Sequence, residues 1–346
     1  MTVGNGSIPL VRVRGLEVQF PTRRGIVHAV NGVDIDIPRG KAVGIVGESG
    51  SGKSVTVMAI ARLLDQGAEV VGGSVDFDGD DVLAGDKAFL RTYHGRRVGV
   101  VFQNPMTSLD PFFTVGDQIT EGPRFHAAER ERDSRVSVRE LRRSFNVDRR
   151  SAHWRETAER LLDRVRIRDP KRVAAAYPFE LSGGMRQRAV IASAVALEPQ
   201  LLIADEPTTA LDVTVQAEIL VLLQDLRERT GASLLMVTHD LSIVAEHCDT
   251  VYVMYGGRVV ERGPSRRLFS MPRHPYTNGL LAAIPALEGP RRELRGIAGG
   301  PPDPMRPPIG CPLVDRCERR LDVCASEFPE ETRGADDHSF WCHNPR

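Results

Sequence analysis

The most informative part of this chain is one octapeptide, Gly47-Glu48-Ser49-Gly50-Ser51-Gly52-Lys53-Ser54. It fits the phosphate-binding loop pattern G-x-x-x-x-G-K-[ST] at every position. The apolar run before it (42–46) predicts a buried strand, and the run after it (55–64) predicts a helix. Glycines let such a loop curl until its N–H groups and the helix N-terminus face one anion. We therefore expect a triphosphate here, with Lys53 reaching the β- and γ-phosphates and the Ser54 hydroxyl binding Mg²⁺.

Composition limits the classes of protein that remain possible. The 46 basic residues balance 46 acidic ones, so no net charge attracts nucleic acid. No run approaches the roughly 18–20 apolar residues that cross a bilayer. The first nine residues lack the charged-then-apolar layout of a signal peptide. We expect a cytoplasmic chain that meets a membrane through a partner, and five cysteines that serve metal binding or packing more than disulfides.

Apolar runs separated by helical segments predict a mostly parallel sheet covered on both faces. The clearest of these strands span 98–102, 201–204 and 233–237, and a fourth spans 250–254. Polar side chains follow three of the strand ends: Gln103, Asp205, Glu206 and His239. Because ligands gather at the carboxyl ends of parallel strands, we group these side chains with Lys53.

Other segments differ from this pattern. Residues 11–20 and 33–37 predict strands near the N-terminus, whereas 115–177 are mostly helical and polar. The stretch 129–150 is crowded with Arg and Glu, which favours a solvated excursion and leaves a contact role open. Beyond Pro285 the strand pattern ends, and a Pro- and Gly-rich linker leads into a short tail with four cysteines.

A second motif lies at 181–188, Leu-Ser-Gly-Gly-Met-Arg-Gln-Arg. Ser182 is a good N-cap, and the glycines leave backbone N–H groups open at the start of a helix that runs to about Leu197. The motif therefore predicts a second anion site, although the chain has one phosphate loop.

Together these motifs resemble an ABC-type ATPase over residues 10–285. The resemblance implies an α/β fold with a mostly parallel core sheet and an antiparallel N-terminal β-subdomain. It also implies an inserted helical subdomain at about 112–180, and it leaves residues 286–346 as a C-terminal extension. The acidic strand end at 201–207 is followed by Ala210-Leu211-Asp212, as in that family.

The resemblance also assigns roles around ATP. Glu206 is the general base that polarises the attacking water, and His239 holds the γ-phosphate and that water. Gln103 senses Mg²⁺, which Ser54 and Asp205 bind, and reports to the membrane partner. Catalysis would consist mainly of positioning and charge stabilisation.

Family members work as head-to-tail dimers that hold ATP between the phosphate loop of one subunit and the second motif of the other. This implies that four residues of the second motif face the partner's nucleotide: Ser182, Gly183, Gly184 and Gln187. Adenine usually stacks on an aromatic residue upstream of the phosphate loop. Phe20 is the nearest candidate, but Pro21 to Gly25 intervene, so a core position in the first strand is an equal alternative.

The string Arg273-His274-Pro275-Tyr276-Thr277 and the run 102–111 resemble ATP-binding subunits of oligopeptide, dipeptide and nickel importers. We expect His274 to have a structural turn role, with metal ligation as the alternative. Of the cysteines, Cys248 lies outside the tail and is expected in the core.

Four cysteines lie in the tail: Cys311, Cys317, Cys324 and Cys342. Intervals of five, six and seventeen residues do not fit the tight pairs of common zinc sites. Four thiolates suit an iron–sulfur cluster, and a similar tail in the importer family implies [4Fe–4S]. Zinc, and cysteines that are uncoordinated or form disulfides, remain alternatives.

The sequence thus predicts the ATP-hydrolysing subunit that energises peptide import at the cytoplasmic face of the membrane. The expected partners are a second homologous ATPase, two transmembrane permeases and, indirectly, an extracytoplasmic peptide-binding protein, without nucleic acid. The alternatives are a soluble ABC ATPase acting on nucleic acid or ribosomes, or an importer of the same family for nickel or another cargo.

Overall fold

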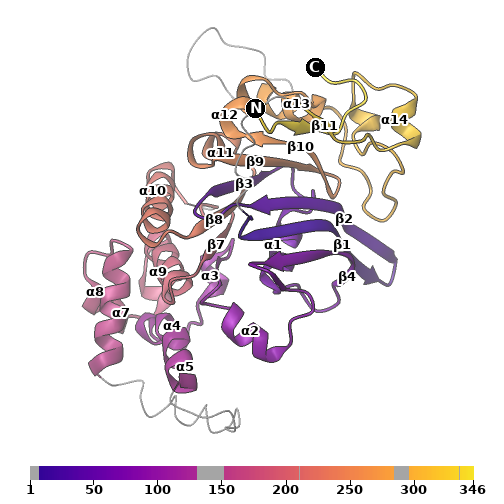
Figure 1. Cartoon of the computed structure of the whole chain (residues 1–346). Helices are drawn as coiled ribbons and strands as arrows, with labels where there is room; N and C mark the ends of the chain where they lie inside the picture. Colours follow the sequence, from indigo (N-terminus) through magenta and orange to yellow (C-terminus); the bar gives the residue numbers. More distant parts are fainter. Residues whose placement is uncertain (1–7, 131–151, 210, 284–295, 335) are drawn as a thin grey trace. The chain divides into compact units, whose positions relative to one another are not determined.

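The computed structural model describes residues 8–130, 152–209, 211–283, 296–334 and 336–346 (Figure 1). The chain divides into two compact units. The first combines Met1–Lys87 with Ser233–Arg346, and the second is Ala88–Ala232. Most of the Arg- and Glu-rich stretch and Ala210 lie outside the described residues.

The first unit begins with an antiparallel sheet of order β2-β1-β4-β5. Its strands are β1 (Val11–Thr22), β2 (Gly25–Ile37), β4 (Glu69–Phe77) and β5 (Asp80–Asp81). The apolar side chains of β1 alternate with exposed ones, as a half-buried strand requires. The hairpin is longer than the sequence predicts, because Thr22 pairs with Gly25 and only two residues form the turn. The expected antiparallel N-terminal sheet is thereby confirmed.

A second set of strands in this unit supplies the core sheet. These strands are β3 (Ala42–Val46), β8 (Ser233–Thr238), β9 (Thr250–Tyr255), β10 (Arg258–Pro264), β11 (Thr332–Arg333) and β12 (Ser339–Phe340). β3 pairs in parallel with β8 and β9, whereas β10 runs antiparallel to β9. Every residue of β3 and β8 is buried, which explains their continuous apolar sequences. The tail returns to this sheet through β12, which pairs with β10.

The helices of the first unit are α1 (Lys53–Ala61), α11 (Leu241–His247), α12 (Ser265–Ser270), α13 (Pro275–Ala282) and α14 (Val323–Ser326), with a 3₁₀ turn η2 (Val314–Arg316). α11 packs on β3 at Gly44, where a Cβ would lie 2.7 Å from Val244 Cγ1 and 3.1 Å from Cys248 Sγ. Cys248 is buried at this contact, so the expected core role is confirmed.

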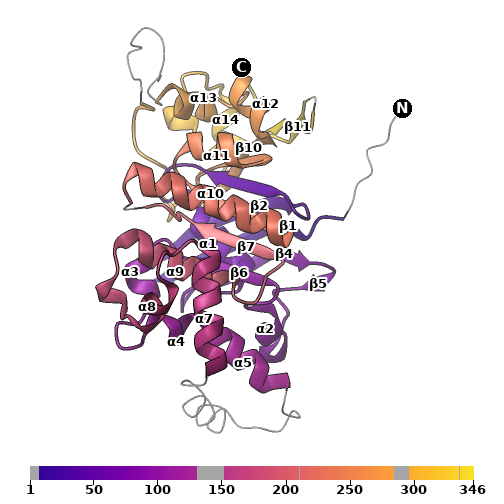
Figure 2. The ribbon, with the colours of Figure 1, turned by 90° about the vertical axis from the view of Figure 1, so that its left-hand side faces the viewer.

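The second unit contains the parallel pair β6 (Val98–Val101) and β7 (Leu201–Asp205). Its helices are α2 (Lys87–Tyr93), α3 (Pro105–Ser108), α4 (Val115–Ile119), α5 (Glu121–Arg130), α7 (Ala152–Arg164), α8 (Pro170–Ala175), α9 (Gly183–Val195) and α10 (Val213–Thr230), with a 3₁₀ turn η1 (Pro178–Glu180). Figure 2 shows α4, α7, α8 and α9 gathered together, in agreement with their mutual contacts. The helical character expected between 115 and 177 is present in the described residues.

Candidate functional site

The phosphate loop connects buried β3 to α1, as the octapeptide predicts. Gly52, the N-cap of α1, has a φ of 95°. The Ala29 carbonyl oxygen occupies the space that a side chain would need, because it would lie 2.4 Å from a Cβ at Gly52. Only glycine fits this combination of left-handed backbone and close approach. α1 therefore begins with no side-chain cap, which leaves its first N–H groups available to an anion.

Lys53, the seventh residue of the phosphate loop, is buried. Its Nζ donates to the carbonyl oxygens of Gly47 and Glu48, each at 2.9 Å. These bonds hold the ammonium on the loop, where the phosphate-binding pattern requires a point charge near the β- and γ-phosphates. The interior of the loop is therefore strongly electropositive.

His239 directly follows strand β8, which ends beside the start of the phosphate loop. Val46 at the end of β3 is opposite Thr238 at the end of β8, so Gly47 and His239 follow the same edge. His239 itself is exposed, and the next residue, Asp240, caps α11 by accepting from the Ser242 N–H at 2.8 Å. The sequence prediction that these strand ends meet is borne out within this unit.

The second unit brings together Gln103, Asp205 and Glu206. Val101 of β6 is opposite Ala204 of β7, so both strands end at one edge. There Gln103 Nε2 donates to Glu206 Oε2 at 2.8 Å, and Asp205 is 4% exposed.

Glu206 is held in an unusual backbone conformation. Its φ is +46°, in a left-handed region that costs a non-glycine residue roughly 1–2 kcal/mol. The Thr209 hydroxyl donates to the same Oε2 at 2.9 Å. The Glu206 carboxylate is thus fixed by two hydrogen bonds, one from a residue far earlier in the sequence and one from a residue three positions later. Such a fixed position suits a group that must orient a reactant.

The second motif begins α9 in the same unit. Ser182 caps the helix by accepting from the Met185 N–H at 3.3 Å, and Ser182 and Gly183 are exposed. At Gly184 a Cβ would lie 2.8 Å from Val215 Cγ1, so a small residue is needed for packing on α10. The predicted exposed helix N-terminus is therefore present.

Two predicted nucleotide contacts have other neighbours here. Gln187 is 1% exposed, and its Nε2 donates to the Pro207 carbonyl at 2.7 Å, which ties α9 to the acidic strand end. Phe20 pairs with Val27 in the hairpin and is half-buried. Their contacts with nucleotide remain predictions.

Comparison with known proteins agrees with this arrangement. The family described as "ABC transporter" matches residues 30–209, and the family described as "Oligopeptide/dipeptide transporter, C-terminal region" matches residues 260–324. The chain belongs to the ABC transporter family. The probable peptide ABC transporter ATP-binding protein y4tR of Sinorhizobium fredii is 43% identical to it, over 96% of this chain and 94% of that protein. The dipeptide transport ATP-binding protein DppD of Bacillus subtilis is 41% identical over 96% and 94%.

Solved structures with the same fold are ABC cassettes. The dimeric ATP-binding cassette MJ0796, in a post-hydrolysis state with ADP and Pi, is 27% identical with a TM-score of 0.59 over 74% of this chain and 99% of that one. CbiO1 of Clostridium perfringens, part of the ABC transporter complex cbiONQ, is 26% identical with a TM-score of 0.57 over 76% and 92%. This ABC ATPase therefore has the predicted α/β cassette fold, and its relatives confirm the oligopeptide/dipeptide branch.

Two residues that contact the phosphate loop of this ABC ATPase were not predicted. The Glu48 N–H donates to the Tyr276 hydroxyl at 2.8 Å, and Arg316 forms an ion pair with the Glu48 carboxylate at 2.8 Å. Burial raises the pKa of Tyr276, which keeps the phenol neutral. The sequence around Tyr276 indicates only the resemblance to the importer family, and no local pattern distinguishes Arg316 among 46 basic residues.

The four tail cysteines line one pocket, although the intervals between them are unequal. Burial, with smaller contributions from the neighbouring thiols, raises the pKa of Cys311 to about 12. Cys324 Sγ accepts from the Leu321 N–H at 3.4 Å. Yet no group of three or more His, Cys, Asp or Glu side chains in the described parts of the chain is arranged to hold a metal ion. The thiols are therefore neighbours without forming a ready ligand set.

His274 lines the same pocket, and its two ring nitrogens have different surroundings. Its Nδ1 accepts from the Tyr276 N–H at 3.1 Å and so caps α13, which is the expected turn role. The proton of the neutral ring must then be on Nε2, which is buried and has no hydrogen-bond partner within the described structure. Such a donor indicates that an acceptor belongs in or beside the thiol pocket.

Among the helices that the structure describes, none has the length and apolar character needed to cross a bilayer.

Proposed function

We propose that this ABC ATPase energises the import of peptides. The observation that carries the proposal is the match of residues 260–324 to the oligopeptide/dipeptide transporter C-terminal region. The nucleotide cassette alone is common to ABC proteins of many functions, whereas this region is specific to one group of transporters. The names of the relatives, which refer to peptide and dipeptide transport, support the same cargo.

The chain's own residues divide the work of hydrolysis. The loop N–H groups and Lys53 would bind the triphosphate, and Ser54 and Asp205 would hold Mg²⁺. Glu206 would orient and polarise the attacking water, and Gln103, which donates to Glu206 at 2.8 Å, would sense the metal. His239 completes the set at the γ-phosphate. No covalent intermediate is needed, because fixed charges and hydrogen bonds stabilise the transferred phosphoryl group.

The active assembly contains a second, homologous ATPase chain. The exposed start of α9 at Ser182 and Gly183 binds the nucleotide held by the partner's phosphate loop. This proposal is supported by the exposed helix N-terminus, which attracts anions, and by the dimeric structure of the similar cassette MJ0796. Gln187 and Phe20 are proposed contacts of the same nucleotide assembly.

Two transmembrane permeases bind this ATPase at the cytoplasmic face of the membrane. The second unit exposes large apolar side chains at Met106, Phe112 and Phe179, with exposed fractions of 62%, 84% and 67%. Tyr177 and Phe179 stack with ring centroids 5.6 Å apart. Exposed aromatic groups of this kind are typical of docking surfaces. A peptide-binding protein outside the cell acts indirectly, through the permeases.

We also propose that the tail thiols hold a [4Fe–4S] cluster. The four cysteines that line one pocket would be its ligands, and the buried Nε2–H of His274 would donate to a cluster sulfur. The cluster would cross-link the tail and supply no electrons, because ATP hydrolysis needs none. Zinc in the same pocket is the alternative outcome of metal analysis.

The proposed domains are an ATPase domain at 10–285, with a helical insertion at about 112–180, and an extension at 286–346. The occurrence of α4, α5, α7 and α8 within one compact unit supports the insertion.

The test of function is reconstitution of the chain with its genomic neighbours. We expect ATP hydrolysis to be slow in the isolated chain and to rise when permeases, the second ATPase and peptide with its binding protein are added in vesicles. Peptide accumulation that requires ATP supports the proposal. Stimulation by ribosomes or nucleic acid, without stimulation by permeases, would overturn it.

A further inference from the structure

Glu48, the second residue of the phosphate loop, is gripped by the C-terminal part of the chain. Arg316 Nη1 donates to Glu48 Oε2 at 2.8 Å, and Nη2 donates to Oε1 at 3.1 Å. This two-point geometry is the strongest form of an arginine–carboxylate pair. The backbone N–H of the same glutamate donates to Tyr276, so both ends of the residue are fixed.

Arg316 is itself held rigidly. Its side chain is 7% exposed, and its remaining hydrogen bonds go to the Tyr255 hydroxyl at 2.9 Å and to two tail carbonyls, Ala298 at 2.9 Å and Ile297 at 3.0 Å. A guanidinium with every side occupied cannot follow a moving carboxylate, so it holds Glu48 in place. Lysine, which has one ammonium on a flexible stem, cannot reproduce these contacts.

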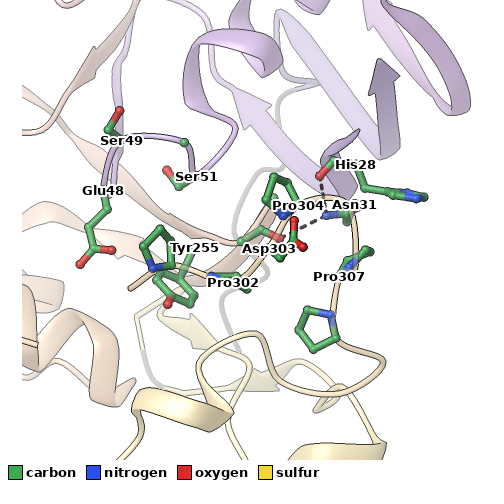
Figure 3. Close-up of a pocket in the computed structure, with 15 residues that line it drawn as sticks. His28, Asn31, Glu48, Ser49, Ser51, Tyr255, Pro302, Asp303, Pro304 and Pro307 are labelled. Carbon is green, nitrogen blue, oxygen red and sulfur yellow. Dashed lines mark hydrogen bonds between the residues drawn. The ribbon is translucent and has the colours of Figure 1, made fainter. Parts of the chain in front are cut away.

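The Pro-rich linker before the tail also contacts the loop. Figure 3 shows Ser49 and Ser51 of the loop at a pocket that Pro302 and Asp303 of this linker also line. The Pro304 carbonyl accepts from the His28 N–H at 2.8 Å, which attaches the linker to β2. The linker is therefore part of the wall around the phosphate loop.

Two physical consequences follow for a triphosphate bound in the loop. A carboxylate without a partner at Glu48 would repel the phosphates, and in partly buried surroundings that repulsion is weakly screened. A loop free to shift would also lose entropy on binding. The ion pair with Arg316 offsets the charge of Glu48, and it also restricts the loop before the triphosphate binds.

We propose that Arg316 is a positioning residue for nucleotide binding, which holds Glu48 and offsets its charge so that the phosphate loop is ready for the triphosphate. The inference rests on the proposed assignment of this loop as the triphosphate site.

The first test compares Arg316→Ala with the unaltered full-length chain in equilibrium titrations with Mg-ATP. We expect the dissociation constant to rise about tenfold, which corresponds to about 1.4 kcal/mol. In the reconstituted transporter KM should rise while kcat changes by less than about twofold. The matched control is Arg262→Ala, which removes another half-buried tail ion pair, to Glu331 at 3.0 Å, away from the loop. Unchanged affinity in Arg316→Ala, or an equal loss in Arg262→Ala, would overturn the inference.

The second test separates charge from folding. Adding Glu48→Gln to Arg316→Ala removes the unpaired carboxylate, so the double variant should recover most of the affinity that Arg316→Ala loses. A double variant as weak as the single one would show that the lost affinity does not come from the unpaired Glu48 carboxylate, and would overturn the charge-offset role of Arg316. Lys53→Ala distinguishes the two proposals: if it binds Mg-ATP normally, the loop assignment fails, whereas if it loses binding and Arg316→Ala does not, only the positioning role fails.

Discussion

Glu206 combines a left-handed backbone with two hydrogen bonds to one carboxylate oxygen. Strain of this kind persists only where the surroundings determine the position fully, and it is common at catalytic residues. The neighbouring Asp205 is buried, while Glu206 remains partly accessible to a reactant. Adjacent carboxylates in different surroundings are suited to different tasks, and we propose metal binding for Asp205 and water activation for Glu206.

Replacing Glu206 with Gln should stop hydrolysis and preserve ATP binding. The amide keeps the size of the carboxylate but cannot accept a proton, and general bases typically contribute about 10²–10⁴-fold. We expect hydrolysis by the assembled ATPase pair to fall by about that factor, and ATP to hold the pair together in size-exclusion chromatography. Glu218→Gln, on the exposed side of α10, is the control. Hydrolysis at the unaltered rate would exclude Glu206 as the base.

His274 should make the chain less stable in mild acid. Burial lowers the pKa of His274 from 6.5 to about 4, against a smaller opposing effect of Glu261. The unfolded chain therefore binds a proton at a higher pH than the folded chain, and folding stability falls as the pH drops from 6.5 toward 4. The loss is at most about 3–3.5 kcal/mol, on the scale of 1.36 kcal/mol per pKa unit.

Denaturant unfolding at several pH values measures this effect. His274→Asn keeps a side chain that can cap α13 but removes the titration. The variant should therefore lose less stability than the unaltered chain between pH 7 and pH 5. Identical pH dependence in the two proteins would show that folding does not lower the pKa of His274.

Among the elements, α1 begins at a position that requires a glycine, Gly52. Gly52→Ala adds a methyl group 2.4 Å from the Ala29 carbonyl oxygen and also forces alanine into a φ of 95°. We expect stability to fall by more than about 2 kcal/mol and ATP affinity to fall with it. Gly231→Ala is the matched control, because Gly231 has a φ of 69° with nothing within 4 Å. It should cost about 1 kcal/mol, so a similar loss in both would contradict the close contact.

The strand elements were largely predictable, because β3, β7 and β8 are buried on every residue and their sequences are apolar without alternation. The helix boundaries were less predictable. α13 begins at Pro275 because His274 caps it with a ring nitrogen, and histidine is not among the usual cap residues. β11 and β12 are two-residue strands, and periodicity cannot reveal strands that short.

At the scale of the whole molecule, the tail joins the metal proposal to the nucleotide proposal. Arg316 directly precedes Cys317, which lines the thiol pocket. A metal that fixes the position of Cys317 would therefore also restrict the adjacent Arg316, which holds Glu48.

If the proposed cluster is present, its removal should consequently weaken nucleotide binding. We expect chain purified without oxygen to contain about four iron and four sulfide per molecule, the composition of a [4Fe–4S] cluster. After chelation or air oxidation, the affinity for Mg-ATP should fall by up to about tenfold, the effect predicted for losing Arg316. In Arg316→Ala, metal removal should have little further effect. Zinc in place of iron would refute the cluster, and unchanged ATP affinity in the metal-free chain would refute the coupling.

The sequence alone determined the nucleotide chemistry of this protein, because the phosphate loop, the strand ends and the capped α9 are local patterns. Each needs only neighbouring residues and the order of strands in a parallel sheet. Tertiary structure decided what surrounds that chemistry. Arg316 meets Glu48 across 268 residues of chain, and four unevenly spaced cysteines line one pocket. Such contacts form where β10, α13 and the tail pack together, and no local pattern of residues specifies that packing.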